Sequence, residues 1–546
     1  MRMDRTRILF VTIIGITILV ILFAFGYNFI NNLTAPAGPE PVAQTDSGGP
    51  GTTAVTPSAR LDSPDPIFGP DDDANANLPT YVCGADAFGS YFTLQQMQMS
   101  GLDIANGFRL GIVPFNFNGD PAYEVSEDQR AALLNAGQWD CLLTTLDAVA
   151  LKSPGVITAI VDETAGADQL WARNVDTLND LKGKRITFSR GSVGEYFVYY
   201  ALSIAQLSPR ADVTLMPQEG VAEAVAFFNQ ERADVVAGWE PDIYDAENSG
   251  GKPLLSSAQL RIVIDVIVTS RQSIADEPDL VQNFHNAWFE TLKAQVENFD
   301  GAAGQIAAWG HNDWSFVYPE TAADDLYAWL ESVAQADLGD NAFVMGDTRP
   351  IVNRLQIARR VWAASDRQVP ADNVSELIDP RFVQRAAEQP RLQARGRPVN
   401  DSFSISSQLD LSGVATGATG VAETLAVLPC RTFTFLPEST TLTLESRRVL
   451  DSCVIPTLSQ SVGLFLRVEG SSAWPANDPP YTEEEILEVA EGRAQSVVNY
   501  LVSQEIDPAR FIIETRLPPP ERRNTTDPNL QAQDRYVELT LVTAGR

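Results

Sequence analysis

Few side chains in this sequence are of the types that carry catalysis or hold metal ions. The 546 residues include two histidines, His285 and His311, and four cysteines. A metal site made of imidazoles or a Ser-His-Asp triad needs histidine close to its other members, and no nucleophile stands convincingly beside a base. The sequence therefore predicts no catalytic residues, no metal site and no cofactor, and it favours a binding or structural role.

The four cysteines fall into two pairs, Cys83 with Cys141 and Cys430 with Cys453. Neither pair has the CxxC spacing that is typical of zinc sites. In an oxidising compartment we expect one disulfide in each of two domains. The alternative is four small buried apolar residues.

The charge of the chain excludes two classes of partner. Lys and Arg number 39 and Asp and Glu number 71, which gives a formal net charge of −32. Nucleic-acid phosphates repel such a surface, and anionic lipids attract only basic patches. We therefore expect neither DNA nor RNA as a partner.

The N-terminal region has the pattern of a membrane anchor. Residues 8–30 carry no charge, and as a helix they would span about 34 Å, enough for the core of a bilayer. Arginines precede the segment and none follows until Arg60, which predicts that residues 1–7 are cytoplasmic and the bulk of the chain is extracytoplasmic. A cleaved signal peptide is the alternative, although its apolar region is usually shorter. Residues 31–78, rich in Pro, Gly, Ser and Asp, are predicted to be a disordered linker.

The remaining sequence predicts two folded regions joined by a second linker, 391–425. In residues 79–390, short β-type runs alternate with helical patterns, which favours parallel sheets covered by helices. Residues 426–546 have the order strand, helix, strand, helix, strand, strand, which predicts a compact α+β unit.

Four motifs in the first region resemble type II periplasmic solute-binding proteins, in the branch that binds nitrate, taurine, sulfonates and thiamine precursors. These are Gly166-Ala167-Asp168, Asp180-Leu181-Lys182-Gly183-Lys184 before a strand, Gly191-Ser192 opening a helix, and Ala233 to Pro241, which includes Trp239-Glu240. The resemblance implies a two-lobed α/β fold that closes on a small solute and delivers it to an ABC transporter permease.

The resemblance also implies where the solute binds. Ligands of open α/β sheets bind beyond the carboxyl ends of strands, where helix N-termini offer N–H groups. The predicted solute contacts are of three kinds. Aromatic side chains can form the walls of the binding site, polar residues stand at strand ends and helix starts, and one acid stands at the family position that can bind a cationic group of the solute. They are Phe88, Tyr91, Trp239, Thr144, Thr145, Ser189, Gly191, Ser192 and Glu240.

The C-terminal region resembles the OmpA-like peptidoglycan-binding domain. It has Phe435, Ser439 and Leu442 at the opening of the family pattern and Asp534 to Glu538 near its end. In that family an aspartate and an arginine bind the charged ends of diaminopimelate. The arginine is present as Arg493, but Ala473 stands where the family has the aspartate. Peptidoglycan binding would therefore lack half of its recognition.

Together these features predict a membrane-anchored extracytoplasmic solute-binding protein with a domain for cell-wall attachment. The alternative is a cell-envelope scaffold or sensor whose two domains have lost their ancestral ligands. A flagellar-stator-like protein also joins one transmembrane helix to an OmpA-like domain, but residues 8–30 lack the acidic residue that proton-driven stators need.

Overall fold

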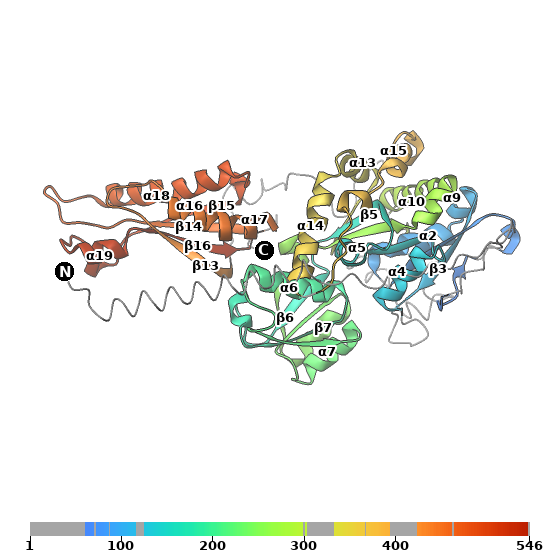
Figure 1. The fold of residues 1–546 in the computed structure, drawn as a ribbon, viewed down its shortest axis with the longest axis horizontal. Helices are drawn as coiled ribbons and strands as arrows, with labels where there is room; N and C mark the ends of the chain where they lie inside the picture. Colours follow the sequence, from blue (N-terminus) through green and yellow to red (C-terminus); the bar gives the residue numbers. More distant parts are fainter. Residues whose placement is uncertain are drawn as a thin grey trace, which may run out of the picture. The chain divides into compact units, whose positions relative to one another are not determined.

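The computed structural model describes residues 61–69, 73–86, 88–115, 125–298, 301–302, 332–365, 367–393, 423–460 and 464–543 (Figure 1). The predicted anchor, 8–30, lies outside these residues. Within the described ranges, no helix combines the length and the apolar character needed to cross a membrane.

The larger lobe is built on a seven-stranded sheet with the order β1-β3-β2-β4-β11-β5-β12. Its strands are β1 (Ile67–Phe68), β2 (Thr80–Ala85), β3 (Arg109–Pro114), β4 (Cys141–Thr145), β5 (Val156–Thr164), β11 (Ile264–Thr269) and β12 (Val333–Gln335). Its helices are α2 (Phe92–Met99), α3 (Leu102–Ala105), α4 (Glu127–Asn135), α5 (Leu146–Lys152), α9 (Arg271–Asp276), α10 (Pro278–Glu297), α13 (Leu338–Gly346), α14 (Arg349–Ala364) and α15 (Arg381–Ala387). Every residue of β5 and β11 is buried, as expected for central strands.

The smaller lobe is a five-stranded sheet with the order β10-β6-β9-β7-β8. Its strands are β6 (Asp168–Ala172), β7 (Arg185–Ser189), β8 (Thr214–Gln218), β9 (Val235–Trp239) and β10 (Lys252–Ser256). Alternate residues of β9 face opposite sides: Ala237 packs in the same core as helix α6 (Val193–Ile204), and Val236 packs with helix α7 (Val221–Asn229). Helices therefore cover both faces of this sheet (Figure 1).

The chain crosses between the lobes twice. It leaves the larger sheet at the end of β5 and enters the smaller one at β6, through a turn in which Gly166 has φ +147. It returns from β10 through α8 (Ser257–Leu260) to β11. The predicted two-lobed α/β fold is confirmed for this part of the chain.

The prediction of parallel sheets is only partly right. Strands β3, β2 and β4 are parallel, and so are β9, β7 and β8. Strand β11 is antiparallel to both β4 and β5, and β6 is antiparallel to both β9 and β10. The cause is the pair of crossings. Two parallel neighbouring strands need a crossover connection, usually a helix, within one sheet, and a strand that the chain enters from the other lobe does not need that connection.

The predicted linker 31–78 extends too far toward the C-terminus. Strand β1 pairs antiparallel with β3 at the edge of the larger sheet. The backbone N–H of Leu61 donates to Gln138 Oε1 at 2.7 Å, and Trp139 Nε1 donates to Ser63 Oγ at 3.2 Å. A polar segment can thus be ordered by pairing with a sheet edge rather than by a core of its own.

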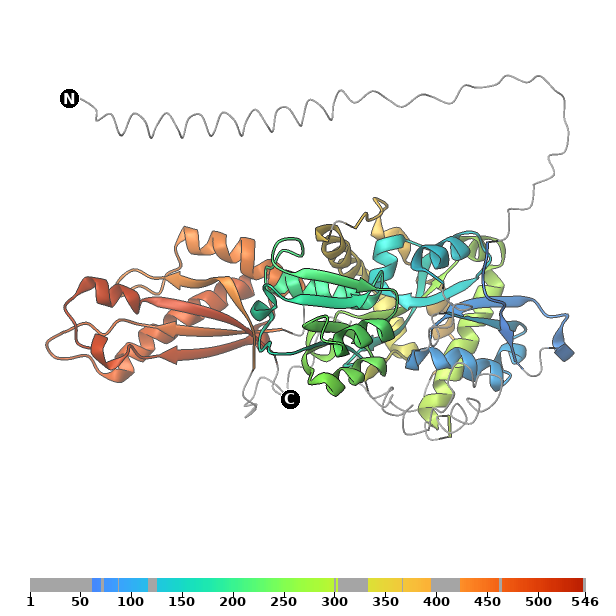
Figure 2. The ribbon, with the colours of Figure 1, turned by 90° about the horizontal axis from the view of Figure 1, so that it is seen from below.

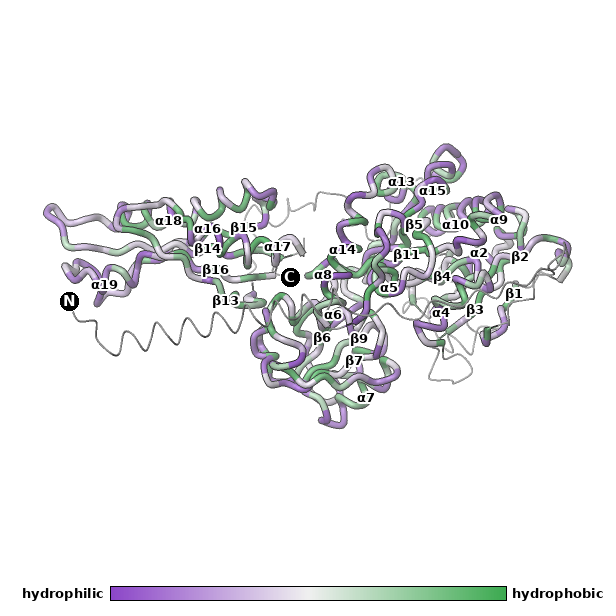
Figure 3. The backbone as a smooth tube through the Cα atoms, viewed as in Figure 1, coloured by the Kyte–Doolittle hydropathy of each residue, from purple (hydrophilic) through white to green (hydrophobic). Residues whose placement is uncertain are grey.

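The C-terminal unit is a four-stranded sheet with the order β13-β16-β14-β15 (Figure 2). Its strands are β13 (Thr424–Thr434), β14 (Phe465–Ser471), β15 (Phe511–Arg516) and β16 (Tyr536–Val542), and its helices are α16 (Leu444–Val449), α17 (Ile455–Gln460), α18 (Glu483–Ser503) and α19 (Pro528–Gln533). Helix α18 packs on β14 so closely that a Cβ at Gly470 would lie 2.1 Å from a backbone oxygen of the helix. Hydrophilic residues dominate α19, whereas β5 and β11 carry hydrophobic ones (Figure 3). The four strands and the helices between the first three come in the predicted order, but α19 between β15 and β16 was not predicted.

Both expected disulfides are present. Cys83 in β2 is bonded to Cys141 in β4, the residue directly opposite it in the ladder, with their Cα atoms 4.5 Å apart. Cys430 in β13 is bonded to Cys453, 23 positions further along the chain.

Candidate functional site

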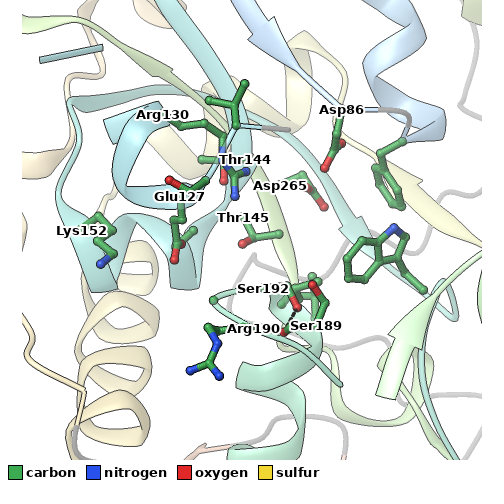
Figure 4. Close-up of a pocket in the computed structure, with 18 of the residues that line it drawn as sticks. Asp86, Glu127, Arg130, Thr144, Thr145, Lys152, Ser189, Arg190, Ser192 and Asp265 are labelled. Carbon is green, nitrogen blue, oxygen red and sulfur yellow. Dashed lines mark hydrogen bonds between the residues drawn. The ribbon is translucent and has the colours of Figure 1, made fainter. Parts of the chain in front are cut away.

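A cavity of about 260 Å³ is lined by residues of both lobes (Figure 4). This volume is close to the lower end of the about 300–1,000 Å³ of small-molecule sites. Of the nine predicted solute contacts, eight line it: Phe88, Tyr91, Thr144, Thr145, Ser189, Gly191, Ser192 and Trp239. The structure thus brings together residues from four separate stretches of sequence, and their role in binding stays a prediction.

Glu240 is the predicted contact that the structure does not place in the cavity lining. Its side chain is buried, and its Oε1 accepts a hydrogen bond from Tyr244 Oη. Burial raises the pKa of this carboxyl. Glu240 directly follows Trp239 at the end of β9, and its carboxyl is held by Tyr244 instead of lining the cavity.

The turn from β7 to α6 is held by its own side chains. Ser192 is the N-cap of α6: its Oγ accepts from Gly194 N at 3.1 Å and donates to Ser189 O at 2.7 Å. Gly191 has φ +71, a conformation that a residue with a Cβ adopts only at a cost. The hydroxyl of Ser192 is therefore already used on the backbone around it.

A carboxylate of the chain occupies the N-terminal turn of α6. Glu195, in the first turn, accepts a hydrogen bond from Gly191 N at 2.7 Å and is 2% exposed. Arg367 binds both of its oxygens, with Nε 3.0 Å from Oε1 and Nη2 on Oε2. A negative charge is favoured here because the N-terminus of a helix carries partial positive charge. The resemblance assigns this helix terminus to a polar or anionic group of the solute, but here the carboxylate of Glu195 already occupies it.

Aromatic side chains form part of the wall. Phe88 and Tyr91, which follow β2, meet edge to face with ring centroids 5.5 Å apart. Trp239 ends β9 and lies opposite Asp168 in the ladder with β6. Such rings offer flat apolar surfaces against which a small ligand can pack.

Three aspartates in the lining, Asp86, Asp168 and Asp265, were missed by the sequence reasoning. Burial raises the pKa of Asp86 to about 6 and that of Asp168 to about 8, and it also raises the pKa of Asp265. Tyr91 Oη donates to Asp265 Oδ1. A sequence signal existed: Asp265 interrupts the apolar run Ile262 to Val268, where a charged residue is costly unless it serves a site.

A fourth aspartate lies directly behind the lining. Asp162 of β5 faces Asp265 of β11 across the antiparallel ladder, and both are almost fully buried. Burial raises both pKa values. The charge of Asp162 raises the pKa of Asp265 further, and the charge of Asp168 raises the pKa of Asp162 further.

Four basic residues also line the cavity, namely Arg130, Lys152, Arg190 and Arg367. Lys152 Nζ lies 2.5 Å from Asp128 Oδ1, and the Arg130 guanidinium stacks over the Phe115 ring at 4.7 Å. Arg190 points away from Asp86 and Asp265 (Figure 4). The lining holds neither histidine nor cysteine, and in the described ranges no three metal-binding side chains converge on a common point.

The C-terminal unit places Arg493 in its interior. The side chain is 1% exposed, and its guanidinium donates to Ser439 O at 3.0 Å and to Ser471 O at 2.9 Å, with a longer contact to Leu436 O. Burial lowers its pKa to about 10. Ala473, which stands at the family's aspartate position, is also buried. Arg493 thus links helix α18 to two other backbone segments of the unit, at 436–439 and at Ser471, and peptidoglycan binding stays a prediction.

Comparison with known proteins agrees with the solute-binding part of the resemblance and does not reach the OmpA-like part. The family described as NMT1/THI5 like matches residues 155–302, less than half of the chain. A search of curated proteins finds no match.

The chain is similar to several solved structures at low identity. The alkanesulfonate-binding protein SsuA from Xanthomonas axonopodis pv. citri, bound to MOPS, is 16% identical over 55% of this chain and 98% of that one, with a TM-score of 0.42. The periplasmic nitrate-binding protein NrtA from Synechocystis PCC 6803 is 13% identical over 59% and 92%, with a TM-score of 0.45. The desulfurization enzyme DszB is 16% identical over 57% and 99%, with a TM-score of 0.36. The activity and ligand of this chain have to be argued from its own cavity.

Proposed function

We propose that this protein captures a small polar solute in the cavity between its two lobes and presents it to an ABC-type transporter. The observation that carries the proposal is the cavity itself, which lies beyond strand ends of two sheets and combines aromatic walls with polar groups. Two chain crossings join the lobes, so a hinge motion would open and close the cavity. The lining contains no histidine or cysteine to activate a nucleophile, which supports capture rather than catalysis.

The rest of the chain would hold this receptor in the cell envelope. Residues 8–30 would anchor it in the cytoplasmic membrane, and the C-terminal unit would attach to the cell wall. The two disulfides support an extracytoplasmic location, because such bonds persist in oxidising compartments.

Trp239→Ala tests the capture role. Thermal-shift measurements on the full chain, with anions, sulfonates, amino acids, amines and pyrimidines, should show stabilisation by at least one class, because a bound ligand raises stability by mass action. Trp239→Ala should remove that stabilisation while the protein stays folded. Phe343→Ala is the matched control, since Phe343 is an exposed ring on α13 outside the cavity lining. Stabilisation by none of these classes would overturn the capture role, and unchanged binding by Trp239→Ala would refute the packing role of the ring.

One observation favours the alternative, a scaffold or sensor without wall-peptide binding. Arg493 already donates to backbone carbonyls, and Ala473 offers no carboxylate for an ammonium group. Pull-down on purified sacculi should compare wild type with Arg493→Ala and with Phe435→Leu, because Phe435 lies under the guanidinium at 5.5 Å and is buried in the same unit. Loss of binding in Arg493→Ala alone supports direct recognition. Equal loss in both variants indicates a structural role, and no binding by wild type supports the scaffold.

A further inference from the structure

Acidic residues outnumber basic ones around the cavity. The six acids of the lining are Asp86, Glu127, Asp128, Asp168, Glu219 and Asp265, against four bases. Two of the bases are paired with acids, Lys152 with Asp128 and Arg367 with Glu195. Asp86, Asp168 and Asp265 take part in neither of these pairs.

These three aspartates have carboxylate oxygens without a donor. Asp168 is 3% exposed and Asp265 is 2% exposed, and the Oδ2 atom of each makes no hydrogen bond to any residue that the structure describes. The same holds within the described ranges for Asp86 Oδ1. Asp86 and Asp265 turn their carboxylates toward the same space (Figure 4). Buried carboxyl oxygens are normally paired, so a cationic ligand that supplies donors would satisfy them and at the same time favour the ionised form of these aspartates.

The turn at α6 argues against an anion as the solute. The Gly191 N–H that would meet an anion donates to Glu195, and Arg367 holds the same carboxylate. Glu195 therefore already takes the place that an anionic solute would occupy at this helix terminus.

The donor is better matched by an organic group than by a metal ion. The described residues contain no set of three or more acidic, histidine or cysteine side chains that converge on one point. An ammonium or amidinium group can instead spread its N–H donors over separate carboxylates. The Trp239, Phe88 and Tyr91 rings in the same lining add the attraction of aromatic faces for a cation.

We propose that the solute is an organic cation, a small molecule whose ammonium or amidinium group lies among Asp86, Asp168 and Asp265 and packs against Trp239. This inference rests on the proposed capture function and gives its substrate class. It departs from the anions that the resemblance implies, because here the helix terminus is neutralised internally and the opposite wall is acidic.

The test is titration calorimetry of the full chain with matched probes. The cations are putrescine and agmatine, which carry N–H donors, the anions are nitrate and methanesulfonate, and uracil is the neutral probe. At least one cation should bind, and Asp265→Asn, which is nearly isosteric, should weaken that binding at least tenfold. Asp176→Asn is the matched control: Asp176 is an exposed carboxylate outside the cavity lining, so its substitution should change affinity less than twofold.

The outcomes separate this inference from the capture role. Binding of an anion or of uracil without any cation overturns the inference and leaves capture in place. Binding by none of the probes, together with no stabilisation in the broader thermal screen, overturns both. Cation binding that Asp265→Asn and Asp168→Asn both leave unchanged overturns the assignment to these aspartates, provided that circular dichroism shows both variants folded.

Discussion

Replacing Asp168 by Asn should stabilise the protein in a way that depends on pH. Asp168 begins β6 and is buried beside other acids, with Asp265, Glu240 and Asp86 raising its pKa further and Thr164 lowering it. Asn has nearly the same shape and carries no charge at any pH. The substitution therefore removes the titration and keeps the packing.

The magnitude follows from the difference between the two pKa values. The ordinary value is 3.8 and the folded value is about 8. Below pH 3.8 the carboxyl is protonated in the folded and the unfolded chain, and it contributes its full stability. As the pH rises toward 8, the unfolded chain releases this proton first, so stability falls by about 1.4 kcal/mol per pH unit. Asp168→Asn should therefore gain about 2 kcal/mol over wild type at pH 5 and about 4 kcal/mol at pH 7.

Hydrogen exchange measured by mass spectrometry gives the local free energy of unfolding in the full chain, even when other domains unfold separately. Peptides that cover β6 and β9 should be followed at pH 5, 6 and 7. Asp176→Asn is the control, because Asp176 is an exposed carboxylate nearby in sequence and its substitution should give no difference that grows with pH. A gain for Asp168→Asn that is constant with pH, or a loss at pH 7, would refute the assignment of a buried protonated carboxyl.

Two further changes probe the framework around the cavity. Replacing Cys83 and Cys141 by Ala opens a loop of 58 residues and should lower the free energy of unfolding by about 4 kcal/mol. Replacing Cys430 and Cys453 opens a loop of 23 residues and should lower it by about 3 kcal/mol. Urea unfolding with and without reductant measures both effects, and a loss near zero would contradict the loop argument. Gly470→Val should destabilise the C-terminal unit by about 3 kcal/mol or more, because the new side chain would force β14 away from α18, and an unfolding midpoint within error of wild type would show that the helix can move.

The sequence was informative where local pattern decides structure. Thr144, Thr145, Ser189 and Ser192 were predicted as contacts because they stand where strands end or helices begin, and the structure gathers them at one cavity. Trp239 was found in the same way, through its motif at the end of a strand.

The acidic side of the cavity could not be predicted from local pattern. Asp162 and Asp265 face each other only through the antiparallel register of β5 and β11, and these strands are a hundred residues apart in sequence. Long-range pairing also explains why the prediction of parallel sheets was only partly right. It explains the assignment of 61–69 to a linker as well, since β1 pairs with β3. Local composition describes a segment, whereas register depends on what lies beside it.

Strand β1 is the first strand that a force applied to the N-terminal side of the described chain would meet. A pulling force on the chain upstream of residue 61 would first meet the hydrogen bonds of Leu61 and Ser63 to the larger lobe. It would then reach two ladder pairs, Ile67 with Ile112 and Phe68 with Gly111, whereas β2 and β3 are joined along six. The short strand would peel away first and act as a sacrificial element that absorbs extension. The next strand, β2, is fastened to β4 by a covalent bond through Cys83, so the load would stop before it distorts the walls of the cavity.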